Sequence, residues 1–284
     1  MYMNSSYLSL LLFILVTIFY FVVLKTPKLT VSMLQDDQGY LSYQKGLYIK
    51  LFIYFMIVVL TQFGVNVSSI ISTCGGSVSQ NIGSAALLTF IPWFFIFGVL
   101  LVVLILFPGW KAAFSNVVGY FMVSGQANSI LSDLLVVDDV NSDILNASGS
   151  DIKTRDALQE AASAIVKLNG NMSLLINQIV PDNFLKYWSI LTPLMKPQYQ
   201  QDPVAAEEIQ QKLLSLVVLR DNIGEAMWYI YTAILLTSIV QYKIATQGCS
   251  PDLASLNENQ QIFQQKQKQI HDENAAAQAN VYTH

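Results

Sequence analysis

Charge is the property that this sequence has least of. Only 12% of its 284 residues are Asp, Glu, Lys or Arg, whereas a typical soluble domain carries about 25%. The segment from Leu51 to Trp110 has no charged side chain and no histidine. Such a segment cannot form an ordinary water-facing surface, so a conventional soluble domain is excluded there.

Basic and catalytic side chains are scarce as well. Arg155 and Arg220 are the only arginines and the formal net charge is −4, so the basic surface that nucleic-acid binding requires is missing. His271 and His284, the only histidines, fall in the polar C-terminal tail, which argues against a histidine base or metal ligand in a folded pocket. The motifs of phosphate-binding loops, zinc proteases and serine hydrolases are absent. We therefore expect a non-enzymatic protein with no catalytic residue, no cofactor, no metal and no nucleic-acid partner.

Long apolar runs take the place of charge. Residues 87–107 form an uninterrupted apolar block, close to the ~20 residues that a helix needs to cross a hydrocarbon core. Pro92 lies near the expected start of this helix, where its missing N–H costs little. Residues 7–24 form another apolar run, and Lys25 and Lys28 follow it without a small-residue cleavage site. This favours an uncleaved membrane helix over a signal peptide.

These runs predict an all-α, multi-span membrane protein with four transmembrane helices and a small helical extramembrane domain. For residues 226–240, a buried helix of the domain is the alternative to a fourth crossing. The predicted segments are transmembrane helix 1 (1–24), a basic loop (25–46), transmembrane helix 2 (47–67), an uncharged loop (68–84), transmembrane helix 3 (85–107), the helical extramembrane domain (108–222), transmembrane helix 4 (223–244) and a Gln/Asn/Ala-rich polar tail (245–284).

Lysines predict the orientation of these helices. Lys25, Lys28, Lys45, Lys50 and Lys111 all lie next to predicted membrane ends on one side. Basic residues close to the ends of spans favour the cytosolic side. Both termini are therefore expected on the opposite side of the membrane.

The extramembrane domain is predicted to be helical. Residues 114–135 form an amphipathic pattern, and apolar residues recur at spacings of three and four from Leu158 to Ile179. This stripe predicts either one face of a self-packing bundle or an intermolecular coiled coil. Asp202 and Pro203 have the residue types of an N-cap and a first helical position, and the helix that they open can continue into the fourth span. The tail is too polar to bury a core, so it is either disordered or a helix that needs a partner.

Two polar residues and two cysteines remain to be placed. Gln62 and Asn66, near the end of the second span, are expected to make hydrogen bonds between helices. On the predicted topology, Cys74 and Cys249 fall on the same non-cytosolic face beside flexible loops. Their α-carbons could then lie within the roughly 4.4–6.8 Å that a disulfide requires. The alternative is two unrelated thiols.

A local sequence pattern follows the third apolar run. In residues 107–135, a Pro/Trp end of span precedes a Ser-Asn…Gly-Tyr motif and an amphipathic helix. This stretch resembles a region in membrane-embedded minor capsid and inner-membrane structural proteins of nucleocytoplasmic large DNA viruses, over about a tenth of the chain. The residues that carry the resemblance are Pro108, Trp110, Phe114, Ser115, Asn116, Gly119 and Tyr120.

The resemblance implies a structural component of a virion that is integral to an internal, host-derived membrane. Such a protein would link the lipid bilayer to the capsid shell or to other membrane proteins. Residues 111–222 and the C-terminal tail are the expected contact regions for these partners, and a homo-oligomer is possible. The alternative is a membrane transport or channel component that acts as an oligomer, although the three surer spans contain no ionisable residue of the kind that transport sites usually keep.

Overall fold

The computed structural model describes residues 5–25, 28–75, 78–135, 172–246, 249 and 260–271. These residues are helical almost throughout. The β-structure among them is a single isolated bridge between Leu135 and Met195. The predicted all-α class is confirmed.

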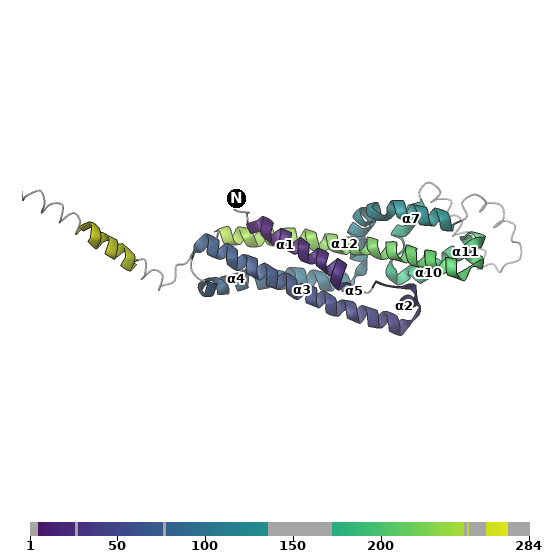
Figure 1. The fold of residues 1–284 in the computed structure, drawn as a ribbon, viewed down its shortest axis with the longest axis horizontal. Helices are drawn as coiled ribbons and strands as arrows, with labels where there is room; N and C mark the ends of the chain where they lie inside the picture. The colour runs from purple at the N-terminus through teal and green to yellow at the C-terminus, as the bar shows by residue number, and fades with distance from the viewer. Residues whose placement is uncertain are drawn as a thin grey trace, which may run out of the picture.

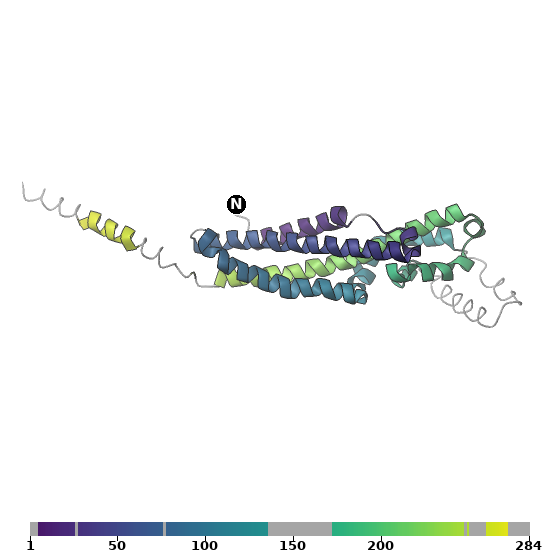
Figure 2. The same cartoon turned by 90° about the horizontal axis from the view of Figure 1, so that it is seen from below.

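An elongated bundle of apolar helices forms one half of the molecule and a helical domain forms the other half (Figure 1). Four helices are long and apolar enough to cross a membrane, judged by length and composition. They lie side by side in both views (Figures 1 and 2). The bundle comprises α1 (Ser5–Phe19) with the π-helical turn η1 (Tyr20–Leu24), α3 (Asp37–Cys74), α4 (Val78–Pro92) with the π-helical turn η2 (Trp93–Gly98) and α5 (Val99–Leu106), and α12 (Pro203–Thr246).

Shorter elements pack on the other halves of α3 and α12 to form the domain. Residues 260–271 form a separate helix in which every residue is exposed. The domain elements are α2 (Val31–Gln35), η3 (Pro108–Lys111), α6 (Ala112–Phe114), η4 (Ser115–Gly119), α7 (Tyr120–Leu134), η5 (Met172–Asn177), η6 (Pro181–Asn183), α10 (Phe184–Leu191), η7 (Thr192–Leu194) and α11 (Pro197–Gln201).

Aromatic rings fill the middle of the bundle. The ring of Phe13 in α1 lies 5.7 Å from Trp93 and 5.6 Å from Phe97, both in η2. Tyr54 of α3 stacks on Tyr229 of α12 at 5.6 Å. All five residues are essentially inaccessible to solvent. Rings at these separations contribute stability beyond their buried area, so this layer fixes how the four helices pack.

Side-chain amides join the helices in the part of the bundle that contains the start of α1 and the end of α12. Gln62 Nε2 donates to the Ser9 carbonyl at 3.0 Å, and Asn66 Nδ2 donates to Thr89 Oγ1 at 2.8 Å. Gln241 Nε2 donates to Asn66 Oδ1 at 3.1 Å. The expectation that Gln62 and Asn66 make hydrogen bonds between helices is confirmed.

The helix α12 connects the two halves without a break. Asp202 Oδ1 accepts hydrogen bonds from the backbone of Val204 at 3.0 Å and of Ala205 at 3.2 Å, and Pro203 is the first helical residue. This confirms the N-cap expected from the sequence. On the domain side, α12 packs against one face of α7, whose buried residues recur every three to four positions. These are Val123, Ala127, Leu131 and Leu134.

The expected basic loop 25–46 is largely helical. Two short side chains start helices within it. Thr30 accepts a hydrogen bond from Met33 N and caps α2, and Asp36 accepts from Gln38 N and Gly39 N and caps α3. These are ordinary N-cap residues. The loop prediction was wrong because it weighed charge and overlooked both caps.

The expected uncharged loop 68–84 is also wrong. The helix α3 continues to Cys74, and α4 begins at Val78. Two of these residues bond within the bundle or the helix: Ser69 Oγ donates to Gln241 Oε1 of α12 at 3.0 Å, and Thr73 Oγ1 donates to the Ser69 carbonyl at 2.9 Å. The reversal occurs at Gly75, whose φ of +71° is costly for other residues.

Pro92 occupies a different place from the one expected. Because α4 starts at Val78, this proline lies inside the helix rather than near its start. Proline removes one backbone hydrogen bond and crowds the preceding turn. The π-helical turn η2, which follows it directly, is the kind of local adjustment that accommodates such a residue.

Most of the apolar stripe from Leu158 to Ile179 lies outside the described residues. Its last part, η5, is a 3-10 helix rather than an α-helix. Within the described part, Ile176 and Ile179 are buried in the core of the domain.

Truncation of Trp93 tests the aromatic layer. We expect Trp93→Ala to lower the free energy of unfolding by about 3–5 kcal/mol, because it leaves a cavity between η2 and α1. Phe95, two residues away, is 72% exposed, so Phe95→Ala should cost about 0.5 kcal/mol or less. Unfolding of the detergent-solubilised protein, followed by circular dichroism, measures both. Equal losses in the two variants would contradict the packing.

Candidate functional site

Buried ion pairs lie where the apolar bundle meets the helical domain. Lys25 Nζ lies 3.0 Å from Glu225 Oε2. Lys111 Nζ lies 3.1 Å from the same oxygen and 3.0 Å from Asp221 Oδ2. These side chains are between 7% and 16% exposed. We refer to Lys25, Lys111, Asp221 and Glu225 as the charged junction.

Three separate segments contribute to the charged junction. Lys25 directly follows η1, and Lys111 is the last residue of η3. Asp221 and Glu225 are four residues apart on α12, so they project from the same face of that helix. Glu225 Oε1 also accepts a hydrogen bond from Tyr229 Oη at 2.6 Å. The junction therefore joins the domain-side ends of α1 and α5 to the middle of α12.

Electrostatics distinguish the two lysines. Burial by itself lowers the pKa of a lysine, because it disfavours the charged form. At Lys111 this effect is outweighed by Glu225 and Asp221, which raise the pKa above its ordinary value. At Lys25 burial prevails over the attraction of Glu225, and the pKa is lowered. Lys111 is thus the better compensated charge of the two.

Two glycines allow the segment after α5 to lie directly on α12. A Cβ atom at Gly119 would lie 2.6 Å from the carbonyl oxygen of Arg220. A Cβ atom at Gly224 would lie 2.7 Å from Ser115 Cβ and 2.8 Å from the carbonyl oxygen of Lys111. Real Cβ contacts are not this short, so a side chain at either position would push the segments apart. The two glycines are what bring Lys111 within reach of Asp221 and Glu225.

Aromatic residues surround this crossing on the bundle side. Trp228 Nε1 donates to the carbonyl oxygen of Trp110 at 2.9 Å. The ring of Phe114 lies 5.0 Å from Trp228 and 6.3 Å from Tyr231. Trp110 and Tyr231 are more than half exposed. The group is therefore a partly exposed aromatic band at the level of the charged junction.

The seven motif residues identified in the sequence all belong to this region. Trp110, Phe114, Ser115 and Gly119 pack on α12, as described above. Tyr120 Oη lies 2.8 Å from Ser173 Oγ, which connects α7 to η5. Pro108 and Asn116 line a cavity beside the charged junction.

Arg220 is a further buried charge beside the junction. Its Nη2 atom donates to the carbonyl oxygen of Ile179 at 2.9 Å, and its Nη1 atom donates to the carbonyl oxygen of Ile176. The side chain is 1% exposed. Arg220 thereby holds the end of η5 against α12, because leaving these carbonyl groups unpaired would cost free energy.

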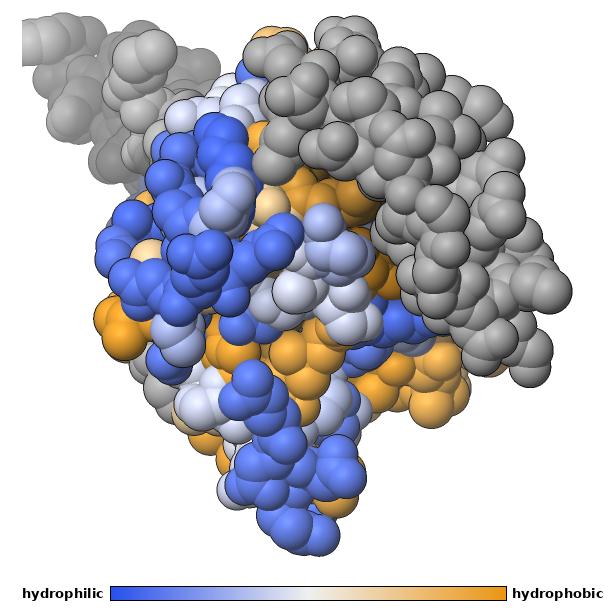
Figure 3. Space-filling view, turned by 90° about the vertical axis from the view of Figure 1, so that its right-hand side faces the viewer, coloured by the Kyte–Doolittle hydropathy of each residue, from blue (hydrophilic) through white to orange (hydrophobic). Residues whose placement is uncertain are grey.

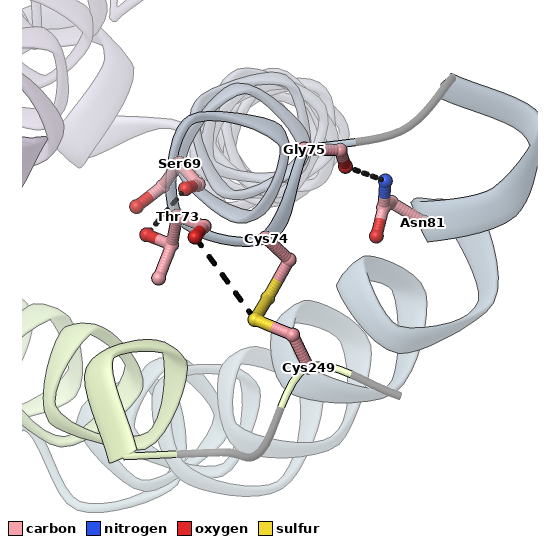
Figure 4. Close-up of a disulfide and its surroundings, with 6 residues drawn as sticks. All are labelled: Ser69, Thr73, Cys74, Gly75, Asn81 and Cys249. Atoms are coloured by element: carbon pink, nitrogen blue, oxygen red, sulfur yellow. Dashed lines mark hydrogen bonds between the residues drawn. A yellow bond between two sulfur atoms is a disulfide. The ribbon is translucent and has the colours of Figure 1, made fainter. Parts of the chain in front are cut away.

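A disulfide joins the opposite end of the bundle. Cys74, the last residue of α3, is bonded to Cys249, which follows α12, and their α-carbons are 5.3 Å apart (Figure 4). Asn81 Nδ2 donates to the carbonyl oxygen of Gly75 at 2.9 Å, which ties the start of α4 to the end of α3 (Figure 4). The structure therefore pairs the two cysteines that were candidates for a bridge.

The charged junction, Arg220 and the disulfide each hold α12 to another segment of the chain. Within the described residues, no group of three or more His, Cys, Asp or Glu side chains could hold a metal ion. His271 lies in the exposed helix 260–271, and His284 lies outside the described residues. The charged side chains of the junction pair with each other.

Comparison with known proteins identifies no relative. No model of a protein family, no curated protein and no solved structure matches this chain. The function has to be inferred from the residues and their geometry.

Sequence reasoning missed most of the charged junction. Lys25 and Lys111 were interpreted only as markers of orientation, and Arg220 only as part of the net charge. The detectable signal was the spacing of Asp221 and Glu225, which places two carboxylates on one helical face at the start of an apolar stretch. Which lysines meet them depends on tertiary packing.

Neutralisation of Glu225 tests the junction. We expect Glu225→Gln to lower the free energy of unfolding by about 3–5 kcal/mol, because two buried lysines lose their shared partner. Glu208→Gln is the matched control, since Glu208 and Lys212 form an exposed ion pair and exposed pairs contribute little. Chemical denaturation of both variants in detergent gives the comparison. A Glu225 variant as stable as the control would show that the ion pairs are not structural.

Addition of a methyl group at Gly224 tests the close contact between α12 and the segment that follows α5. Gly224→Ala should destabilise the fold by about 1–3 kcal/mol, because the new Cβ overlaps Ser115 and Lys111. Gly125 is a helical glycine at which an added Cβ would meet nothing within 4 Å. Gly125→Ala should therefore stabilise by about 0.5–1 kcal/mol. Thermal unfolding of the two variants should move in opposite directions, and a shift in the same direction would contradict the crossing.

Removal of the disulfide tests the distal end of the bundle. Replacing both Cys74 and Cys249 by serine should lower the free energy of unfolding by about 2–5 kcal/mol, because the bridge constrains a long unfolded loop. Mass spectrometry of unreduced, alkylated wild-type protein should recover a linked Cys74–Cys249 peptide. Recovery of both cysteines as separately alkylated peptides would refute the bridge.

Proposed function

We propose that this chain is a non-enzymatic structural membrane protein that anchors a helical domain to a bilayer. The observation that carries the proposal is the charged junction. It fixes an apolar bundle and a polar domain to each other through the continuous helix α12. Such a connection holds the domain at a fixed position relative to the bundle, as a structural link requires.

The surface of the bundle supports membrane insertion. Large apolar side chains remain exposed along all four long helices, including Val22 at 67%, Phe52 at 63%, Phe95 at 72% and Leu235 at 47%. Apolar surfaces of this extent are unusual on soluble monomers and indicate contact with lipid or protein. Lipid is the simpler partner, because the exposed residues are distributed around the bundle.

The aromatic band supports a membrane boundary at the level of the charged junction. Trp110, Trp228 and Tyr231 lie together beside Lys25 and Lys111, and Trp and Tyr are enriched where membrane meets water. Lysines at the same level favour the cytosolic side. The disulfide lies at the other end of the bundle, where an oxidising compartment would keep it intact.

The filled interior favours a structural role over transport by a single copy. The rings of Phe13, Trp93 and Phe97 contact each other across the middle of the bundle. A solute passing through one copy would have to displace them.

We further propose that the membrane is the internal, host-derived membrane of a virion and that the partners are capsid or other membrane proteins. Support for the virion comes from the resemblance carried by residues 107–135. Support for a partner surface comes from the domain end of the molecule, where hydrophilic residues cover much of the visible described surface (Figure 3). Lys186 and Lys212 are exposed on the domain, and Lys243 is exposed near the opposite end of α12.

Crosslinking in intact particles tests this proposal. The protein should resist extraction from membranes at alkaline pH and should purify with virions in a fixed copy number. Amine-reactive crosslinks to shell proteins should form at Lys186 and Lys212. They should disappear in a Lys186→Arg/Lys212→Arg variant and persist in the control Lys243→Arg, because arginine keeps the charge but not the reactive amine.

Three outcomes would overturn the proposal. Release of the protein at alkaline pH would refute membrane insertion. Crosslinks to the shell through Lys243 rather than the domain would refute the assigned partner surface. Ion or solute flux through reconstituted protein would favour the alternative, a transport component formed by several copies.

A further inference from the structure

A cavity of about 270 Å³ lies beside the charged junction. Its lining comes from both halves of the molecule, with residues of α3, α5 and α12 and of the segments that connect them. This volume is slightly below the ~300 Å³ at which small-molecule sites usually begin. It is large enough for a compact polar group and too small for an acyl chain as well.

The wall of the cavity is divided into an apolar part and a polar part. The apolar part consists of the ends of the bundle helices, with Leu51 on α3 and Leu101, Leu104 and Ile105 on α5. The polar part is formed by the charged junction, Arg220, several tyrosines and three asparagines. Together with Gln44, Ser115 and Asp182, these polar residues are Tyr20, Lys25, Tyr40, Tyr43, Tyr48, Lys111, Asn116, Asn177, Arg220, Asp221, Asn222, Glu225 and Tyr229.

The exposed lining residues indicate where the cavity opens. Tyr48 on α3 is 46% exposed and Ile105 on α5 is 37% exposed, and both line the cavity. Phe52 lies one turn further along α3, Val102 lies one turn further along α5, and both are exposed. On this side the opening is therefore flanked by the apolar surface that would contact lipid, and on the domain side it is flanked by the exposed residues Pro108, Asn116 and Asp182.

One buried hydrogen-bond donor that lines the cavity has no acceptor in the described part of the chain. Arg220 Nε is buried and has no hydrogen-bond partner among the described residues. In the same part of the chain, neither the Tyr20 hydroxyl nor the Tyr43 hydroxyl is engaged in a hydrogen bond, although both residues line the cavity. Burying a donor without an acceptor is costly, so Arg220 Nε calls for a partner. A group with several acceptor oxygens would satisfy Arg220 Nε and accept from the two tyrosine hydroxyls as well.

We propose that this cavity binds the phosphate headgroup of a phospholipid, whose acyl chains leave between α3 and α5. The proposal rests on the proposed insertion of the bundle into a bilayer, since it places the cavity at the level of lipid headgroups. The phosphate oxygens accept from Tyr20, Tyr43 and Arg220, and the apolar part of the wall contacts the glycerol end of the chains.

Three cationic side chains, those of Lys25, Lys111 and Arg220, line the cavity together with the three carboxylates of Asp182, Asp221 and Glu225. Lys25 shares Glu225 with Lys111, and burial lowers the pKa of Lys25 because its compensation is incomplete. A phosphate close to Lys25 would supply the compensating charge and favour the ammonium form. The bound lipid would also contact both α3 and α5, since both helices line the cavity.

Lipid retention by the purified full-length protein tests the proposal. The wild-type protein, extracted from membranes and exchanged into a lipid-free detergent, should keep one phospholipid per chain in native mass spectrometry. The variant Tyr20→Phe/Tyr43→Phe removes two hydroxyls and keeps both rings. Its retention of added phosphatidylglycerol should fall about tenfold, since hydrogen bonds to charged groups are the strong ones. Tyr7 is exposed and lies outside the lining of the cavity, about 20 Å along the helix from Tyr20. It provides the matched control Tyr7→Phe, which should retain lipid like the wild type.

The remaining outcomes are decisive. Equal retention by the double variant and the wild type would overturn the proposal, as would a wild-type protein that keeps no phospholipid. Displacement of the lipid by millimolar inorganic phosphate would assign the cavity to a soluble phosphate instead. If the double variant loses helicity, Tyr43→Phe alone decides, because Tyr43 is only partly buried. Extraction of the wild type from membranes at alkaline pH would refute membrane insertion. Lipid retention in detergent tests the cavity, so the two proposals can fail independently.

Discussion

The carboxylate of Glu225 is the group on which the rest of this structure depends. It contacts two lysines that come from distant parts of the chain, and it does so where little water is available to solvate any of the three charges. Removing an ion from water costs several kcal/mol unless a partner compensates it. Lys25 and Lys111 are therefore bound to α12, and the ends of α1 and α5 are bound with them.

Close packing makes this electrostatic arrangement possible. Gly119 and Gly224 remove the side chains that would otherwise separate the η4 segment from α12, and the backbone of Lys111 then lies directly against that helix. Arg220, one turn before Gly224, uses its guanidinium group to hold η5 on the other side. The domain is thus attached by backbone contact and charge pairing at one level of α12. The disulfide fastens the far end of the same helix to α3, so α12 is fixed at both ends of the bundle.

The differences between expected and observed elements have specific causes. The two expected loops are mostly helical in the structure. They were predicted as loops because charged residues are concentrated in the first and turn-forming residues in the second. In water, Ser69 and its neighbours favour turns. Inside a bundle, their side chains bond to Gln241 and to the preceding turn, and the helix continues. Asp36 shows the converse case, since its capping role was readable from residue type alone and was overlooked. Pro92 looked acceptable only because the start of its helix was placed too late.

The sequence by itself determined the all-helical class, the apolar helices and the continuity of α12, because hydrophobic period, helix length and capping act over neighbouring residues. It also restricted the only possible disulfide to Cys74 and Cys249. The partners of Glu225, the role of Arg220 and the cavity beside them were decided by tertiary structure. Each requires segments separated by about 40 to 200 residues to meet, and no local pattern specifies which buried charges will share one site.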